Sequence, residues 1–140
     1  MRDGWQRRLL LALLLLAPAA VTACAPGAQN ASVTPLSSPA IVLDTYLRML
    51  VAGDCNAGRR LASATFGKGN GELCGATQVS AFVIDPGPAR PSSNEVVFAA
   101  RITTSGTADG SVPAGEVTWF YSLDRRLDGS WRIVGGGSGP

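Results

Sequence analysis

Histidine is absent from this 140-residue sequence, and cysteine occurs only three times. Without histidine, a histidine–aspartate acid–base pair is excluded, and a nucleophilic cysteine lacks its usual base. Zinc loses its usual nitrogen ligand, and the cysteines provide no third ligand at metal-binding spacing. The composition therefore argues against metal-dependent and histidine-dependent chemistry, and we expect neither a metal nor a cofactor.

An excess of charge of either sign is also lacking. Residues 1–23 contain three of the 12 basic residues and one of the 10 acidic residues, so the remainder has nine of each and no net charge. Lysine occurs once, as Lys68, and there is no arginine-rich stripe. Because nucleic-acid binding depends on a positive surface, the sequence predicts no nucleic-acid partner.

The N-terminal residues have the pattern of an export signal. Arg7 and Arg8 precede the apolar run 9–23, which Pro18 interrupts. A positive segment followed by a short apolar segment is typical of a secretory signal peptide. The alternative is a transmembrane helix, but such a helix needs about 20 apolar residues, and this run has 15. We predict a signal peptide over residues 1–23.

The end of this run contains the first cysteine. Val21, Thr22, Ala23 and Cys24 form a sequence that resembles the bacterial lipobox, in which an aliphatic residue and two small residues precede a cysteine. The resemblance implies cleavage before Cys24, lipidation of its thiol and acylation of its new amino group. The protein would then be a lipoprotein anchored to the extracytoplasmic face of the cell membrane. The alternative is an ordinary cleavage site beside a spare thiol.

The rest of the chain divides into three parts. Residues 24–38 are rich in Ala, Ser and Pro and carry no charge, which indicates a disordered tether. Residues 39–135 have the regular apolar periods of a folded domain. Residues 136–140 follow as a predicted flexible, glycine-rich tail.

The domain begins with helical patterns and continues with strand patterns. Ser38 and Pro39 are a good helix start, and an apolar stripe with helical spacing predicts a helix over 39–52. The stripe consists of Leu43, Tyr46, Leu47, Leu50 and Val51. A weaker helix is expected over 55–66, where Gly58 lowers the propensity.

Four segments then alternate with a period of two: 77–85, 95–104, 116–126 and 131–134. In the first of them, Val79, Ala81 and Val83 are expected to share one face. Short connections between successive strands favour an antiparallel sheet, and helices followed by strands indicate the α+β class.

Cys55 and Cys74 remain as a pair once Cys24 is lipidated. Export places them where disulfides persist, and a bridge would close a glycine-rich loop. A metal pair or a catalytic thiol are the alternatives, and neither has the histidine or the further ligand that it needs. We predict a disulfide.

Two stretches carry a resemblance to the nuclear transport factor 2-like superfamily, whose members include SnoaL-like polyketide cyclases and ketosteroid isomerases. Residues 46–54 are similar to its first helix and the Gly-Asp break that follows, and 119–123 with 128–133 are similar to its terminal hairpin. The chain also resembles small actinobacterial lipoproteins. The resemblance covers 39–135 and implies helices packed on a curved antiparallel sheet of about four strands, shaped like a cone. The family commonly has three helices, and this sequence has one clear helix and one weak one.

The fold suggests a non-catalytic domain that binds a small apolar ligand or an envelope protein, in addition to the membrane contact through Cys24. Tyr46, Trp119 and Tyr121 are candidates for lining a cavity, although aromatic residues with this spacing are more often core.

The alternative function is a small isomerase, dehydratase or cyclase. Such an enzyme needs a carboxylate base in an apolar pocket, and the candidates are Asp44, Glu95 and Glu116. Asp44 has Arg48 one turn away, and the two glutamates begin strands, so all three are expected at the surface.

Overall fold

The computed structural model describes residues 38–139. The helical elements are α1 (Pro39–Val51), α2 (Cys55–Arg59) and the short 3-10 helix η1 (Phe66–Lys68). The strands are β1 (Val79–Ile84), β2 (Arg90–Pro91), β3 (Glu95–Ser105), β4 (Ala114–Arg125) and β5 (Trp131–Gly137). Cys24, the signal peptide and all but the last residue of the predicted tether lie outside the described residues.

Helix α1 forms for the reasons that the sequence indicates. The Ser38 side chain accepts a hydrogen bond from the Ile41 amide at the start, and Gly53 adopts a left-handed conformation just after the end. The apolar stripe is buried as predicted, except that Val42 replaces Val51 on the buried face. Val42 belongs to the core, whereas Val51 is 38% exposed. The predicted helix is therefore confirmed, and its buried face is rotated slightly toward Val42.

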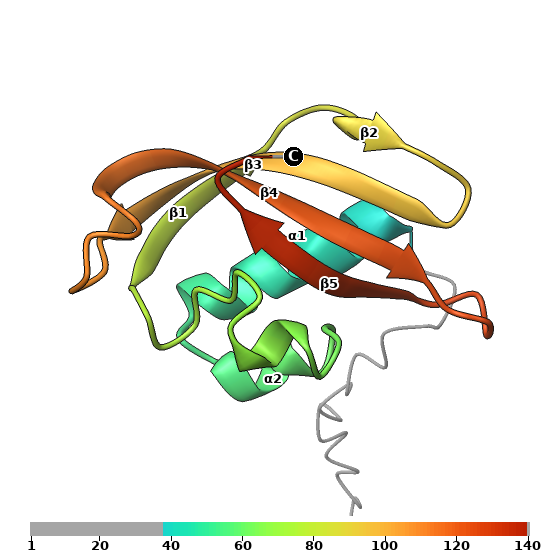
Figure 1. Ribbon diagram of the computed structural model, residues 1–140, viewed down its shortest axis with the longest axis horizontal. Coiled ribbons are helices and arrows are strands. Elements are labelled where there is room, and N and C mark those ends of the chain that lie inside the picture. The colour runs from blue at the N-terminus through green and yellow to red at the C-terminus, as the bar shows by residue number, and fades with distance from the viewer. Residues whose placement is uncertain (1–37, 140) are drawn as a thin grey trace, which may run out of the picture. The chain divides into compact units, whose positions relative to one another are not determined.

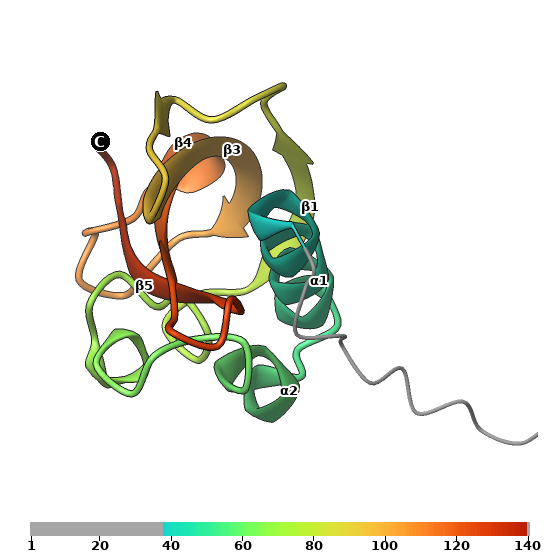
Figure 2. The ribbon, with the colours of Figure 1, turned by 90° about the vertical axis from the view of Figure 1, so that its right-hand side faces the viewer.

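The strands form one antiparallel sheet in the order β1-β3-β4-β5. The short β2 pairs with Val96 and Val97 at the start of β3. Figure 1 shows α1 lying across the sheet, and Figure 2 shows the strands curving around it. Helix α1 contacts both β1 and β5, which are at opposite ends of the strand order. The sheet must therefore curve around the helix, and the predicted α+β class with its curved antiparallel sheet is confirmed.

The hydrophobic core fills the space between α1 and the concave face of the sheet. Its members come mainly from α1, from the segment between α2 and β1, and from the strands. They are Val42, Leu43, Tyr46, Leu47, Leu50, Leu61, Phe66, Leu73, Val79, Val96, Phe98, Ala100, Ile102, Val112, Trp119, Tyr121, Leu123 and Ile133.

Strand β1 departs from the predicted alternation. Its register shifts at a bulge between Val79 and Ala81. Val79 is buried, but beyond the bulge Phe82 and Ile84 are the residues that pack against the core, and Val83 is exposed. An extra residue in a strand reverses the faces of everything after it, so the prediction that Val79, Ala81 and Val83 share one face is wrong.

Two element boundaries also differ from those expected. Helix α2 ends at Arg59, and a single 3-10 turn at Phe66–Lys68 replaces the remainder of the predicted second helix. Strand β5 continues through Gly137, so residues 136 and 137 of the predicted tail pair with Tyr121 and Phe120 of β4.

Candidate functional site

Four aromatic side chains meet beneath α1, and we refer to Tyr46, Phe66, Trp119 and Tyr121 as the aromatic cluster. The ring of Tyr46 packs edge-on against Phe66 and against Tyr121, with 5.7 Å between ring centroids in both pairs. All four residues are buried, and Trp119 is the most exposed at 9%. The residues proposed from the sequence as cavity lining thus lie together in the interior.

Each of these residues is placed by an element with a clear sequence signal. Tyr46 belongs to the apolar stripe of α1, and Trp119 and Tyr121 are two apart on β4, so they share its inner face. Phe66 begins η1, where the Ser63 hydroxyl accepts a hydrogen bond from its amide. Sequence reasoning found the first three and missed Phe66, because the segment that carries it has no regular period.

The cluster contains three buried polar atoms with unmet hydrogen-bonding capacity. The hydroxyls of Tyr46 and Tyr121 and the indole Nε1 of Trp119 have no hydrogen-bond partner among residues 38–139. A buried polar group without a partner costs about 1–3 kcal/mol, and most native structures satisfy nearly all such groups. Three in one cluster therefore require an explanation.

The protonation of the two phenols follows from their surroundings. Burial, together with the nearby Glu72 carboxylate, raises the pKa of Tyr46 above its ordinary value. Burial also raises the pKa of Tyr121 well above its ordinary value, with a smaller contribution from the neighbouring Tyr46. Both hydroxyls therefore stay protonated at neutral pH, and the cluster offers three hydrogen-bond donors.

An ion pair lies beside the cluster. The guanidinium of Arg59 donates to both oxygens of Glu72, at 2.8 and 3.4 Å. The Glu72 side chain is only 6% exposed, whereas that of Arg59 is 47% exposed. Glu72 is the buried carboxylate that sequence reasoning missed. The position of Glu72 depends on how the loop folds, which no local pattern shows. The predicted Cys55–Cys74 bridge did indicate that residue 72 would lie close to the helix that carries Arg59.

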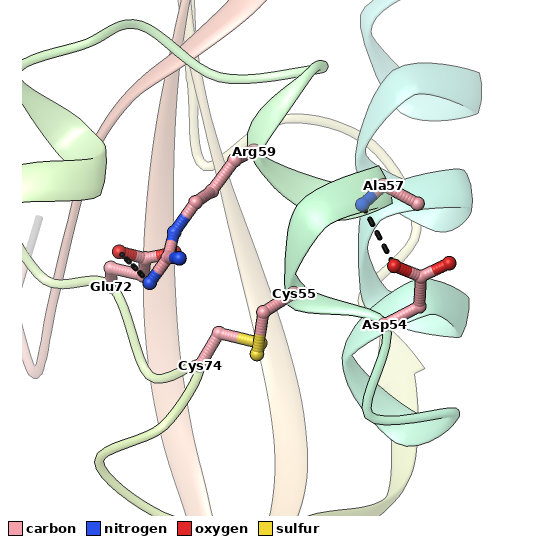
Figure 3. The surroundings of a disulfide bond; sticks show 6 residues. All are labelled: Asp54, Cys55, Ala57, Arg59, Glu72 and Cys74. Atoms are coloured by element: carbon pink, nitrogen blue, oxygen red, sulfur yellow. Dashed lines mark hydrogen bonds and ion pairs between the residues drawn. A yellow bond between two sulfur atoms is a disulfide. The ribbon is translucent and has the colours of Figure 1, made fainter.

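The bridge itself is present. Cys55 at the start of α2 and Cys74 form a disulfide with 5.6 Å between their Cα atoms. Figure 3 shows it next to the Arg59–Glu72 pair, with Asp54 capping α2 at the Ala57 amide. The predicted disulfide is thus formed in the structure, and it holds the loop against α2.

Residues 60–78, which we call the covering segment, connect α2 to β1 and pass along β5. The segment adds to the edge of β5. The amide of Ser63 donates to the Ile133 carbonyl at 2.7 Å, and the Ile133 amide donates to the Leu61 carbonyl at 3.1 Å. Further along, the Asn70 side chain donates to the Val134 carbonyl at 2.8 Å. These bonds hold the segment that places Phe66 against Tyr46 in the cluster.

A groove of about 540 Å³ borders the disulfide. It is lined by the end of α1, the two cysteines, residues 75–78 and residues 105–106. None of the three residues proposed as cavity lining borders this groove. The groove and the aromatic cluster are therefore separate features.

The carboxylates proposed from the sequence are not part of the cluster. Asp44 accepts a 2.7 Å hydrogen bond from Arg48 at the surface of α1, and Glu95 and Glu116 are exposed on β3 and β4. Within residues 38–139, no group of three or more acidic or cysteine side chains is arranged to hold a metal ion. No helix in that range is long and apolar enough to cross a membrane.

The long helix, the covering segment and the curved antiparallel sheet together define a nuclear transport factor 2-like fold. A solved structure of this class is the nuclear transport factor 2-like protein of unknown function in nutrient uptake from Rhodospirillum rubrum, with a TM-score of 0.51. The match covers 71% of this chain and 95% of that one at 14% sequence identity, a level at which it establishes the fold alone. No known protein family and no curated protein sequence matches the chain.

Proposed function

We propose that this chain is a lipid-anchored, extracytoplasmic and non-catalytic domain that binds a small, largely apolar molecule in its interior. The observation that carries the binding function is the set of three buried donors without partners on Tyr46, Trp119 and Tyr121. A ligand that accepts hydrogen bonds from them would recover free energy that the ligand-free fold lacks.

The chemistry of the cluster narrows the class of ligand. The Trp119 Nε1–H can only donate and each tyrosine hydroxyl carries one donor, so acceptors such as carbonyl or ether oxygens can satisfy all three groups. The residues around the three donors are apolar and aromatic, which favours a hydrophobic body. The Glu72 carboxylate beside Tyr46 disfavours an anion. A neutral apolar compound with one or two oxygen acceptors fits best.

The ion pair between Arg59 and Glu72 favours binding over catalysis. Glu72 is the carboxylate closest in character to a general base, since its side chain is almost fully buried near Tyr46. Both of its oxygens already accept hydrogen bonds from Arg59. A carboxylate held in this way is poorly placed to take a proton from a substrate, so we prefer the non-catalytic role to that of an isomerase, dehydratase or cyclase.

The proposal for the anchor depends on Cys24 and the lipobox-like residues before it. Replacing Cys24 by Ala should move the protein from the membrane fraction to the soluble fraction, and mass analysis of the wild-type chain should find acyl groups on residue 24. A Cys24→Ala variant that stays in the membrane fraction contradicts the anchor.

The binding function is tested with pairs of compounds that share a skeleton. A polycyclic ketone and the hydrocarbon of the same shape are added separately to the protein, and the thermal unfolding midpoint is measured. We expect the ketone to raise the midpoint more than the hydrocarbon, and we expect the Tyr46→Phe and Tyr121→Phe double variant, which keeps only the Trp119 donor, to reduce the difference. If no acceptor-bearing compound stabilises the protein and a solved structure places only ordered water at the three donors, the proposal is wrong.

A further inference from the structure

The turn between β4 and β5 presents an apolar side chain to solvent directly after two arginines. Leu127 is fully exposed, and Arg125 and Arg126 beside it are exposed as well. The ion pairs formed among residues 38–139 involve Arg48, Arg59 and Arg101, so neither arginine of the turn is neutralised by one. An exposed leucine on its own is ordinary, and its significance depends on what the turn faces.

The turn is held firmly by its own hydrogen bonds. The Arg126 amide donates to the Ser130 carbonyl at 2.7 Å, and the Gly129 amide donates to the Arg126 carbonyl at 2.9 Å. Asp128 accepts from the amide and the hydroxyl of Ser130, at 2.9 and 2.7 Å, which directs its carboxylate toward the base of the turn. The other nearby acid, Asp124, is half-buried opposite Arg132 in the register of β4 and β5. The exposed side chains of the turn are therefore Leu127, the two arginines and Asp128, whose carboxylate is engaged by Ser130. One guanidinium nitrogen of Arg125 lies 4.0 Å from where a Cβ on Gly129 would be.

The turn lies at the end of the domain where the chain enters it. In Figure 1 the β4–β5 turn and the start of α1 lie toward the same end of the domain, and the β3–β4 loop lies toward the opposite end. A second exposed apolar residue, Ile41, is in the first turn of α1. The chain between Cys24 and Ser38 has 14 residues after the cysteine and reaches ~45 Å at most when extended.

We propose that the β4–β5 turn, Arg125–Gly129, docks on the surface of the anionic lipid bilayer to which the chain is anchored. Leu127 enters the interface, and Arg125 and Arg126 meet the phosphates of the headgroups. This inference rests on the proposed lipid anchor at Cys24, because the anchor decides which surface the turn faces. Its consequence is a fixed orientation, with the groove-bearing side and the β3–β4 loop held away from the membrane.

The anchor makes a weak contact sufficient. A flexible linker of this length gives its two ends an effective concentration in the mM range, so a turn with an intrinsic affinity of about 1 mM is substantially bound. Burial of one leucine contributes about tenfold to partitioning, and each arginine near an anionic surface contributes about fivefold. Multiplied together, these factors give about 250-fold, or an affinity of about 4 mM, which is within the mM range of the effective concentration.

The first test measures depth in the lipidated protein. Leu127→Cys creates the single free thiol of the mature chain, because Cys55 and Cys74 are bridged and Cys24 carries the lipid. A fluorophore on this thiol is compared with the same fluorophore on Ala108→Cys in the exposed β3–β4 loop. Both proteins are reconstituted in phosphatidylglycerol–phosphatidylcholine vesicles whose acyl chains are brominated. We expect strong quenching at residue 127 and little at residue 108; equal quenching at the two positions overturns the proposal.

The second test does not depend on the anchor or on a label. The chain from residue 24 with Cys24→Ser retains every described residue, and its partitioning onto the same vesicles is measured by flotation. Leu127→Ser should lower the partition coefficient about tenfold, and Ala108→Ser should leave it unchanged. Equal partitioning of the two variants overturns docking of the turn even if Cys24 is lipidated. If Cys24 carries no lipid, the anchor fails separately, and a preserved effect of Leu127 in this assay still supports the lipid contact.

Discussion

The backbones of Gly71 and Gly136 lie against each other, one from the covering segment and the other from β5. A Cβ on Gly71 would overlap the carbonyl group of Gly136, and a Cβ on Gly136 would lie 2.8 Å from the Trp119 indole Nε1 and 3.0 Å from the Gly71 carbonyl oxygen. No side chain of any size fits between these elements. The two glycines thus allow the covering segment to close over the aromatic cluster.

Replacing Gly136 by Ala should therefore destabilise the protein. The added methyl group would force apart Trp119 and the covering segment, and overpacking of this kind costs about 1–3 kcal/mol. The free energy of unfolding from urea denaturation measures the effect. Gly139→Ala is the control, because a Cβ there meets nothing within 4 Å. Equal stability of the two variants would contradict the close approach.

The run of glycines also shows where sequence reasoning reaches its limit. Glycine is unfavourable in strands, so residues 135–137 have no strand signal of their own. They form the end of β5 because they pair with β4. They are glycines because the backbone of the covering segment at Gly71 leaves no room for a side chain at Gly136. A close approach between residues 71 and 136 is a tertiary fact that no local pattern contains.

Other features were predictable because local physics determines them. The cap at Ser38 and the helical stripe were sufficient to predict α1, and the alternation of Trp119, Tyr121 and Leu123 was sufficient for the inner face of β4. The faces of β1 were not predictable, since a bulge changes the register without changing the composition. Of the candidate site, the tyrosines and Trp119 could be found, whereas Glu72 and Phe66 depend on the path of the covering segment.

The unpartnered hydroxyls make an unusual stability prediction. Tyr46→Phe and Tyr121→Phe each remove a buried polar group that has no partner among the described residues. We expect the free energy of unfolding of the ligand-free protein to stay the same or rise by about 1 kcal/mol. Urea denaturation of the two single variants measures it.

A buried hydroxyl with partners provides the matched control. Thr104 is buried, and its hydroxyl donates to the Pro113 carbonyl at 2.8 Å and accepts from the Gly106 amide at 3.1 Å. Thr104→Val should therefore lower the stability by about 1–3 kcal/mol. If the tyrosine variants are destabilised as much as Thr104→Val, the tyrosine hydroxyls have partners in solution that remain bound in the absence of ligand.

Stability should also fall in alkaline solution. Both tyrosines have a raised pKa in the folded protein, chiefly through burial, while in the unfolded chain a phenol ionises near pH 10. Above that pH the unfolded chain binds fewer protons than the folded protein, so the free energy of unfolding decreases as the pH rises. The contribution is fully present below pH ~10.

The double variant Tyr46→Phe, Tyr121→Phe isolates this effect, because these are the only two tyrosines in the sequence. Denaturation curves at several pH values between about 8 and 11 span the ionisation of the unfolded phenols. The wild-type protein should lose stability across this range more steeply than the variant. Parallel loss in both proteins would mean that the tyrosine hydroxyls are accessible to solvent.

The disulfide should stabilise the domain through the covering segment. It joins residues 19 apart in the sequence, and closing a loop of this size contributes about 3 kcal/mol in the chain-entropy treatment. The Cys55→Ser, Cys74→Ser double variant should lose about that amount, and alkylation of the wild-type protein should label neither cysteine until it is reduced.

The exposed ion pair of Arg101 and Asp85, 3.6 Å apart, offers a comparison, since Arg101→Met should change the stability by less than about 1 kcal/mol. Because the bridge holds Glu72 against Arg59, its loss should also expose the aromatic cluster, which the near-UV circular dichroism of the tyrosines and Trp119 would detect. An unchanged near-UV spectrum in the double variant would show that the bonds to β5 alone keep the covering segment in place.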